Sequence, residues 1–271
     1  MPIAVFTPTN AFGGLDVNWA SICRQTLAKD IVWFVADELL DRRKHIYSQF
    51  HESGRCAGVI SFRVPRREGS KLNLASSYAK GMELARGFGC EIFISLQDYI
   101  WLPPDSAEKM LSICRQADPC IPSALCSITD NPTVDKVVDP EGLLTIFAEP
   151  YTSKPEDTYW WSDLEVRGKG LEPSLYDVPS CHYWELNWAA VSNSVLYSDI
   201  AFDDEFDMRG ISCENHDYAQ QAITKCGAKV ILDTTQHTLG LPHKLYFPKR
   251  TEMFGTLTEP ARAYFMEKWG F

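Results

Sequence analysis

Short apolar runs alternate with helix-like segments through the first hundred residues of the chain. Three runs, 3–7, 31–36 and 92–96, are rich in β-branched and aromatic residues and end at polar turns, which is typical of buried strands. Apolar residues recur at helical spacing over 72–86, and Gly87 ends that pattern. Strands and helices that alternate in this way predict a parallel sheet with crossover helices.

The rest of the chain is less regular. Two further helices and three further strands are expected, over 105–116, 214–226, 124–129, 143–148 and 229–233. The segment 151–180 lies among them and is rich in Pro, Gly, Trp and charged residues. A connection of this length is more often functional than inert.

Composition narrows the class of protein. A chain of 271 residues with 45% hydrophobic residues can bury a full core. Its net charge of −10 argues against a protein that grips nucleic acid over a broad basic face. No secretory signal is visible, and no segment reaches the roughly 20 apolar residues that span a bilayer. We therefore expect no transmembrane segment. The nine cysteines include no CxxC pair and fit reduced thiols, which predicts a cytoplasmic protein.

One stretch of the chain departs from the acidic average. Eight basic residues lie between Arg42 and Lys71, against only Glu52 and Glu68. Such a run is usually a solvated surface, and the alternative is a local patch that faces a diphosphate or another polyanion. We expect a mixture, in which one or two of these side chains contact a ligand.

The clearest candidate for chemistry follows the apolar run 92–96. That run ends abruptly at the polar pair Gln97-Asp98. A carboxylate at the carboxyl end of a central strand lies where ligands bind in α/β sheets, and it can hold a divalent cation against a phosphate. The alternative is that Asp98 is only a turn residue.

Further motifs occur in order around this one: Ile3-Ala-Val-Phe-Thr-Pro-Thr-Asn10, Ile31-Val-Trp-Phe-Val-Ala-Asp37, Gly69-Ser-Lys-Leu-Asn-Leu-Ala75, Trp188-Ala-Ala-Val-Ser-Asn193, Phe202-Asp-Asp-Glu-Phe-Asp207 and Cys213-Glu-Asn-His-Asp-Tyr218. Over about 3–233 this ordered set resembles the family 2 glycosyltransferases with the GT-A fold. The resemblance implies an α/β fold of the Rossmann-like nucleotide-diphospho-sugar transferase type, with a mixed central sheet flanked by helices. It also implies a single domain, 1–271. Its parts would be a nucleotide-sugar-binding half (about 1–102), an acceptor-binding half (about 103–240) and a C-terminal extension (241–271).

On the donor side, the resemblance assigns ligand contacts to the ends of the first two strands. The residues Thr7, Pro8, Thr9 and Asp37 match positions that grip the base and ribose. For Asp37 the alternative is a helix cap at the strand end. Lys71 matches a lysine that opens a helix near the phosphates.

The resemblance also implies a metal, Mn²⁺ or Mg²⁺, at the donor diphosphate. Family members usually carry a pair of acids after the fourth strand, whereas this chain has Gln97-Asp98, so only Asp98 is carried over as a ligand. Several GT-A enzymes complete the metal site with a C-terminal histidine. His237 and His243 are both candidates for that role.

On the acceptor side, Glu214-Asn-His-Asp217 matches the Glu-Asp motif whose Asp is usually the general base of an inverting transfer. This chain has Asn215 there, so Glu214 or Asp217, at i and i+3 of one helix face, would take over as catalytic residue. A Glu-Asn pair also resembles the retaining polypeptide N-acetylgalactosaminyltransferases, which require no side-chain base. The plain alternative is an acidic first turn favoured by the helix dipole. Polar side chains over 184–193 and 202–207 would face sugar hydroxyls.

The resemblance implies a metal-dependent glycosyltransferase that moves a sugar from a nucleoside-diphosphate sugar, expected to be a UDP-sugar, to an acceptor hydroxyl. The acceptor is a carbohydrate or another hydroxyl-bearing molecule. A hydroxylated nucleobase in DNA is a minority alternative, and the basic run is its support. Two rival classes are a sugar-nucleotide pyrophosphorylase and a catalytically impaired sugar-nucleotide-binding protein. The first lacks a basic residue in the glycine-containing turn after the first strand, and the second is suggested by Gln97 and Asn215.

Overall fold

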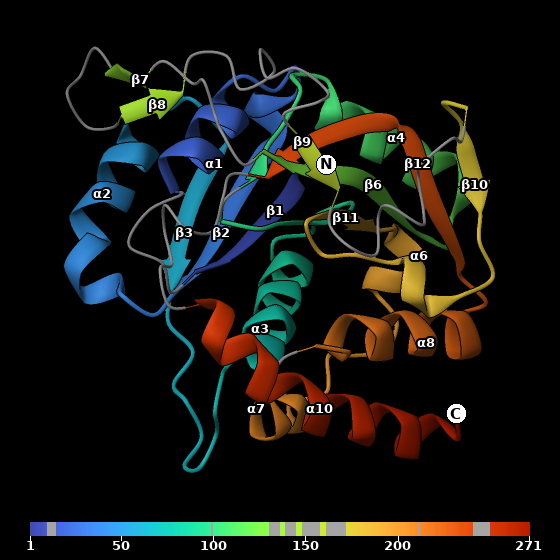
Figure 1. The fold of residues 1–271 in the computed structure, drawn as a ribbon. Helices are drawn as coiled ribbons and strands as arrows, with labels where there is room; N and C mark the ends of the chain where they lie inside the picture. Colours follow the sequence, from blue (N-terminus) through green and yellow to red (C-terminus); the bar gives the residue numbers. More distant parts are fainter. Residues whose placement is uncertain are drawn as a thin grey trace.

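The structure is a computed structural model that describes residues 1–9, 15–98, 100–129, 136–138, 145–147, 158–160, 172–210, 212–240 and 250–271. Within these ranges, ten strands form one mixed sheet (Figure 1). Its main path runs in the order β10-β12-β6-β11-β4-β1-β2-β3, while β5 pairs with β12 and β9 pairs with β6. The strands are β1 (Ile3–Thr9), β2 (Ile31–Asp37), β3 (Gly58–Phe62), β4 (Phe93–Leu96), β5 (Ile100–Trp101), β6 (Cys120–Thr129), β9 (Thr158–Trp160), β10 (Leu175–Asp177), β11 (Trp188–Val191) and β12 (Lys229–Gly240).

The N-terminal half of the sheet is parallel, which confirms the prediction from the alternating pattern. β1 pairs with β2 from Ile3↔Ile31 to Thr9↔Asp37, and on its other edge with β4. β3 extends the sheet beyond β2, also in parallel. All seven residues of β1 and all seven of β2 are buried, as expected for strands that are covered by helices on both faces.

The C-terminal half makes the sheet mixed. β11 lies antiparallel to both β4 and β6, and β12 runs parallel to β6. β12 continues seven residues beyond the expected end at Asp233, through a register shift between Asp233 and His237. There the Asp233 carboxylate accepts hydrogen bonds from the backbone N–H of Thr235 (2.8 Å) and from Gln236 Nε2 (2.5 Å). The polar residues 233–236 therefore form a bulge, and the strand continues beyond it.

Two further strands, β7 (Lys136–Val138) and β8 (Thr145–Phe147), form a separate two-stranded sheet. The strand expected over 143–148 is therefore present, but outside the main sheet.

Helices cover both faces of the main sheet (Figure 1). The first face packs against α1 (Leu15–Cys23), α2 (Leu40–Glu52) and α4 (Ser106–Ala117). The second face packs against α3 (Leu74–Gly87), α6 (Asn193–Leu196), α7 (Glu205–Arg209), α8 (Glu214–Cys226) and α10 (Arg250–Trp269). Short 3-10 turns lie at η1 (Ala28–Asp30) and η4 (Cys181–Tyr183).

Side chains of β1 alternate between the two cores. Val5 belongs to the core of the first face, while Phe6 belongs to that of the second, where its ring lies 4.8 Å from that of Tyr78. This alternation is the period of two that a buried strand imposes.

The C-terminal helix α10 was not anticipated from the sequence, which predicted only an extension over 241–271. Pro260 lies inside the helix and interrupts the pattern by which helices are found. Ala261 and Phe265 are buried and join the core of the second face. In Figure 1 this helix, in red, runs alongside α7 and α8. None of the helices in the described ranges has the length and apolar character needed to cross a membrane.

Candidate active site

Three strands end together at one edge of the sheet. Thr9 closes β1, Asp37 closes β2, and Asp98 follows β4 by two residues. Thr9 and Asp37 are register partners, and Thr9 Oγ1 donates a 2.9 Å hydrogen bond to Asp98 Oδ2. All three side chains are nearly buried, and Asp98 is 4% exposed. The edge expected from the sequence to bind a ligand therefore does bring these three residues together.

The other two predicted residues of β1 lie deeper in the strand. The hydroxyl of Thr7 accepts a 3.0 Å hydrogen bond from Trp33 Nε1, and Thr7 is completely buried. Pro8 follows it in the strand, paired with Ala36 of β2. Thr9 is the one of these three β1 residues whose side chain is bonded to Asp98, and nucleotide contact by Thr7 and Pro8 stays a prediction.

Asp37 is bound to the start of α2. Its Oδ1 accepts from the backbone N–H of Leu39 (2.7 Å), and its Oδ2 accepts from the hydroxyl of Tyr47 (2.7 Å). The guanidinium of Arg43 lies 3.6 Å from the same Oδ2. Burial, reinforced by this carboxylate, raises the pKa of Tyr47. Asp37 thus holds the start of α2 to the end of β2, and its contact with a nucleoside stays a prediction.

The chain that leads into β11 reaches the same edge. The backbone N–H of Gln97 donates to the carbonyl of Asn187 (3.1 Å), and Ser95 Oγ donates to the carbonyl of Leu186 (2.5 Å). The residues just before β11 therefore lie beside Gln97-Asp98. Sequence reasoning placed 184–193 on the acceptor side but did not single out Glu185 or Asn187.

The first turn of α8 adjoins that segment. Asn215 Nδ2 donates a 2.8 Å hydrogen bond to the carbonyl of Trp184, and His216 Nε2 lies 3.8 Å from Glu185 Oε1. Through these contacts the start of α8 packs against residues 184–187, the segment whose last carbonyl accepts the hydrogen bond from Gln97. Burial alone would lower the pKa of His216, but its neighbours Cys213 and Glu185 raise it to about 9. His216 lies inside the motif Cys213–Tyr218, but the sequence did not indicate a role for it.

Glu214 is the buried carboxyl group of this turn. It is 7% exposed, and burial raises its pKa to about 7, with Asp207 raising it further while backbone hydrogen bonds and His216 lower it. A carboxyl group with a pKa near neutrality can take up or release a proton at physiological pH.

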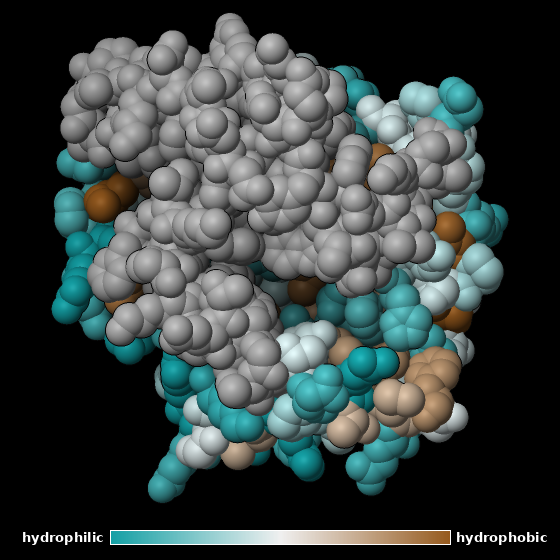
Figure 2. Space-filling model, in the orientation of Figure 1, coloured by the Kyte–Doolittle hydropathy of each residue, from teal (hydrophilic) through white to brown (hydrophobic). Residues whose placement is uncertain are grey.

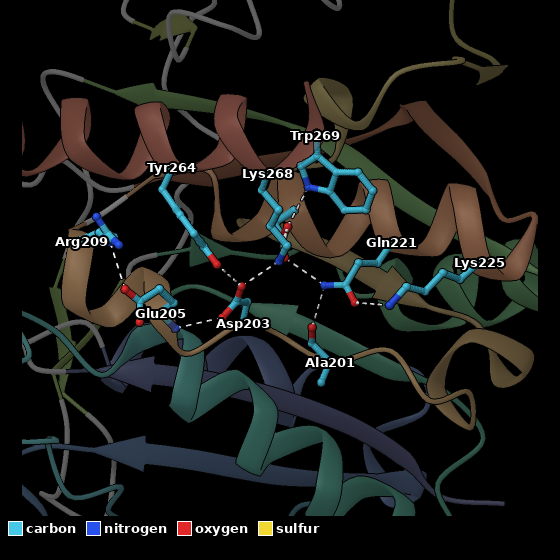
Figure 3. Close-up of polar contacts among 10 residues, drawn as sticks. Ala201, Asp203, Glu205, Arg209, Gln221, Lys225, Tyr264, Lys268 and Trp269 are labelled. Atoms are coloured by element: carbon cyan, nitrogen blue, oxygen red, sulfur yellow. Dashed lines mark hydrogen bonds and ion pairs between the residues drawn. The ribbon is translucent and has the colours of Figure 1, made fainter. Parts of the chain in front are cut away.

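Asp217 lies one turn further along α8 but in different surroundings. It is completely buried, and its carboxylate accepts from Gln221 Nε2 (2.9 Å) and from the indole N–H of Trp269 (2.8 Å). The ammonium group of Lys268 lies 2.8 Å from its Oδ1. The carboxylate is therefore bound to α10 and to its own helix through Gln221, Lys268 and Trp269, the three partners labelled in Figure 3.

Lys71 and the acidic segment 202–207 meet at the start of α3. The backbone N–H of Lys71 donates to the carbonyl of Asp207 (2.9 Å), and its exposed ammonium donates to the carbonyl of Arg209 (3.2 Å). The Asp207 carboxylate accepts from the backbone N–H groups of Ala75 (2.9 Å) and Ser76 (3.0 Å), so it caps α3. Asp207 therefore binds protein groups where sugar hydroxyls were expected.

The basic run 42–71 is partly neutralised by nearby carboxylates. Three of its arginines form exposed ion pairs, Arg63 with Asp41, Arg66 with Glu38 and Arg67 with Asp204. The described surface visible in Figure 2 is mostly hydrophilic, with scattered hydrophobic residues.

Asp98 supplies an oxygen ligand of the kind that Mg²⁺ and Mn²⁺ accept. The end of β12 comes close to it in the sheet, because Gly240 pairs with Ile100, two residues after Asp98. The backbone of His237 lies in β12 opposite Leu125, while its side chain and His243 fall outside the described residues. Within the described ranges no group of three or more His, Cys, Asp or Glu side chains is arranged to hold a metal ion. The donor atom of Asp98 fits a divalent cation, and the histidine ligand stays a prediction.

The architecture matches solved structures of known proteins. GalNAc-T7, solved with UDP, GalNAc and Mn²⁺, aligns with a TM-score of 0.58 over 89% of this chain and 44% of its own, at 14% sequence identity. The chain has the GT-A fold. Residues 1–349 of S. aureus TarS, solved in complex with UDP, align with a TM-score of 0.56 over 90% of this chain and 61% of their own, at 10% identity.

The fold expected from the sequence is therefore confirmed, whereas the narrower resemblance to family 2 stays a prediction. No protein-family model matches the sequence, and no curated protein sequence matches it. The chain spans less than two thirds of the length of either structural neighbour.

Proposed function

We propose that the protein is a glycosyltransferase that moves a sugar from a UDP-sugar to an acceptor hydroxyl. The observation behind this proposal is the meeting of Thr9, Asp37 and Asp98 at the sheet edge, on a GT-A fold. That edge is where α/β sheets bind nucleotides. Two structural neighbours were solved with UDP, which supports the choice of nucleotide.

On the donor side, Asp98 and one histidine, His237 or His243, would hold Mn²⁺ or Mg²⁺. When bound, the cation neutralises charge that develops on the departing diphosphate. Thr9 orients the Asp98 carboxylate through its 2.9 Å hydrogen bond. Asp37 contacts the nucleoside from the neighbouring strand end, and the ammonium of Lys71 attracts the phosphates.

On the acceptor side, Glu214 receives the proton of the attacking hydroxyl in an inverting transfer. Its pKa of about 7 suits this exchange near neutral pH. Asp217 is less suited, since three protein groups already surround its carboxylate. In a retaining transfer an oxygen of the departing diphosphate accepts the proton instead, and Glu214 only orients the acceptor.

The acceptor is a hydroxyl-bearing molecule such as a carbohydrate. DNA that carries a hydroxylated base receives less support, because the net charge is −10 and three arginines of the basic run are ion-paired with carboxylates.

A thermal-shift series tests the proposal. UDP and UDP-sugars, each with and without Mn²⁺, should raise the melting temperature most when nucleotide and metal are both present, because ligands that bind only the folded state stabilise it. ADP and GDP serve as matched controls. Absence of a shift with every uridine nucleotide would refute the proposal. Binding of a UDP-sugar without release of UDP, with any carbohydrate acceptor or water, would instead favour the sugar-nucleotide-binding protein suggested by Gln97 and Asn215.

A further inference from the structure

We propose that Lys268 and Trp269 of α10 are positioning residues that hold the first turn of α8, and with it Glu214, in place through Asp217. This inference rests on the proposed role of Glu214 at the acceptor side and deepens it.

The contacts between α10 and the neighbouring elements converge on the carboxylates of Asp217 and Asp203, and Figure 3 shows Tyr264 and Lys268 pointing toward Asp203. Lys268 Nζ lies 2.7 Å from Asp203 Oδ2 and 2.8 Å from Asp217 Oδ1. The hydroxyl of Tyr264 also donates to Asp203 (2.8 Å), and the indole of Trp269 donates to Asp217 (2.8 Å). A completely buried carboxylate such as Asp217 needs these partners, because an unpaired charge in the interior is strongly unfavourable.

Aromatic side chains at the end of α10 reach the same turn of α8. The ring of Phe265 lies 6.2 Å from that of His216 and 5.8 Å from that of His182, measured between ring centroids. Phe265 is buried and stacks on Phe271. α10 therefore touches α8 at both His216 and Asp217, the second and third residues after Glu214.

The turn that these contacts hold has a strained backbone. Ser212 and Cys213, which precede Glu214, have φ angles of 92° and 68°. Residues other than glycine rarely adopt this left-handed region, and they persist there only where the surroundings fix them. The backbone N–H of Asp217 donates to the carbonyl of Cys213 (2.8 Å), so the residue anchored by α10 is bonded directly to the strained turn.

The test measures the ionisation of Glu214 directly and needs no acceptor. Side-chain carboxyl ¹³C NMR would follow the titration, with the Glu214 signal assigned by its loss in Glu214→Gln. The charged groups that act on this carboxyl are Asp207 of α7 and His216 of its own helix. In Lys268→Met and in Trp269→Phe, we expect its pKa to fall from about 7 toward its ordinary value of 4.5, because the turn loosens and water reaches the carboxyl.

The direction of the change separates positioning from a direct charge effect. Removal of a nearby cation would raise the pKa of a carboxyl group, whereas exposure to water lowers it. The conservative variant Lys268→Arg should keep the wild-type titration of Glu214. The control Lys80→Met, which breaks an exposed ion pair with Glu83, should also leave that titration unchanged. Trp269→Phe removes the indole N–H but keeps an aromatic side chain and leaves the ion pair of Lys268 with Asp217 in place. It therefore provides the answer if Lys268→Met does not fold.

A pKa of Glu214 that stays near 7 or rises in both variants would overturn the inference, even if both lose stability. UDP binding is a separate measurement in the same variants. Its absence in the wild-type protein would refute the proposed function without bearing on the titration.

Discussion

The hydroxyl of Thr9 donates a 2.9 Å hydrogen bond to the carboxylate of Asp98, and the two residues lie 89 positions apart in the sequence. The bond joins the carboxyl ends of β1 and β4, adjacent parallel strands in the centre of the sheet. It fixes one oxygen of the Asp98 carboxylate at this edge of the sheet. Asp98 is therefore oriented by the fold itself, and its replacement gives a direct test of the donor side.

Asp98→Asn should abolish the part of UDP binding that depends on Mn²⁺ while the fold persists. The amide oxygen still accepts the hydrogen bond of Thr9, but the negative charge that attracts a cation is lost. Isothermal titration with UDP, with and without Mn²⁺, measures the effect, and we expect at least about a tenfold loss of affinity when Mn²⁺ is present, equivalent to about 1.4 kcal/mol. Unchanged affinity for UDP and Mn²⁺ would show that Asp98 is not a metal ligand.

Asp37→Asn should lower the stability of the protein. The carboxylate accepts bonds from Leu39 and Tyr47 and faces Arg43, so the amide would present an N–H group to one of these donors. Loss of a buried, charge-assisted hydrogen bond costs about 1.5–3 kcal/mol. Urea denaturation measures this loss, and UDP titration of the folded variant measures nucleoside contact. If UDP affinity is normal in the folded variant, Asp37 has only the structural role.

Much of the N-terminal half could be predicted because its candidate site residues lie at strand ends. Thr9, Asp37 and Asp98 follow apolar runs that only a buried strand explains, and parallel pairing brings their ends together. The direction of individual side chains was not predictable in the same way. Thr7 satisfies the indole of Trp33, and the sequence separation of 26 residues gives no local signal of that contact.

In the C-terminal half, α10 contacts Asp203 and Asp217, and these contacts explain what the sequence did not reveal. Glu214 and Asp217 look equivalent at i and i+3 of one helix. Asp217 differs because it is bound by Lys268 and Trp269, which lie more than fifty residues later in a helix that contains Pro260. Local pattern cannot distinguish two carboxyl groups when the distinguishing partners are distant in sequence.

Gly81→Ala should destabilise the fold despite the higher helix propensity of alanine. A Cβ at Gly81 would lie 2.6 Å from Cδ2 of Phe6, a completely buried ring that also packs against Tyr78 and Phe93. Overpacking of this kind costs about 1–3 kcal/mol. Thermal unfolding measures the loss.

Gly87→Ala at the end of the same helix is the matched control for Gly81→Ala. A Cβ there meets nothing within 4 Å, so stability should stay the same or rise slightly. Equal stability of the two variants would contradict the packing around Phe6.

The pH dependence of stability should report the burial of Glu214. Its pKa is about 7 in the folded protein and 4.5 as the ordinary value, so the folded state holds the proton more tightly. The stability that this group contributes is full below pH 4.5 and is lost as the pH rises to 7, by up to about 3 kcal/mol. Glu214→Gln should lack this decline. Urea denaturation of both proteins at pH 5 and pH 8 measures it, and parallel losses in the two would show that other groups cause the effect.

Glu214→Gln and Asp217→Asn should separate the catalytic carboxyl from the structural one. If the transfer inverts the anomeric carbon, the wild-type rate should rise with pH through about 7 as Glu214 becomes the base. Glu214→Gln should then lower kcat by roughly 10² to 10⁴ with UDP affinity nearly unchanged. Asp217→Asn should mainly lower stability, because its oxygens accept from Gln221 and Trp269 beside the charge of Lys268. NMR of the product gives the anomeric configuration. A retained configuration would remove the base role from Glu214, since a diphosphate oxygen then takes the proton. If the configuration is inverted but Asp217→Asn loses more kcat than Glu214→Gln, the base is Asp217.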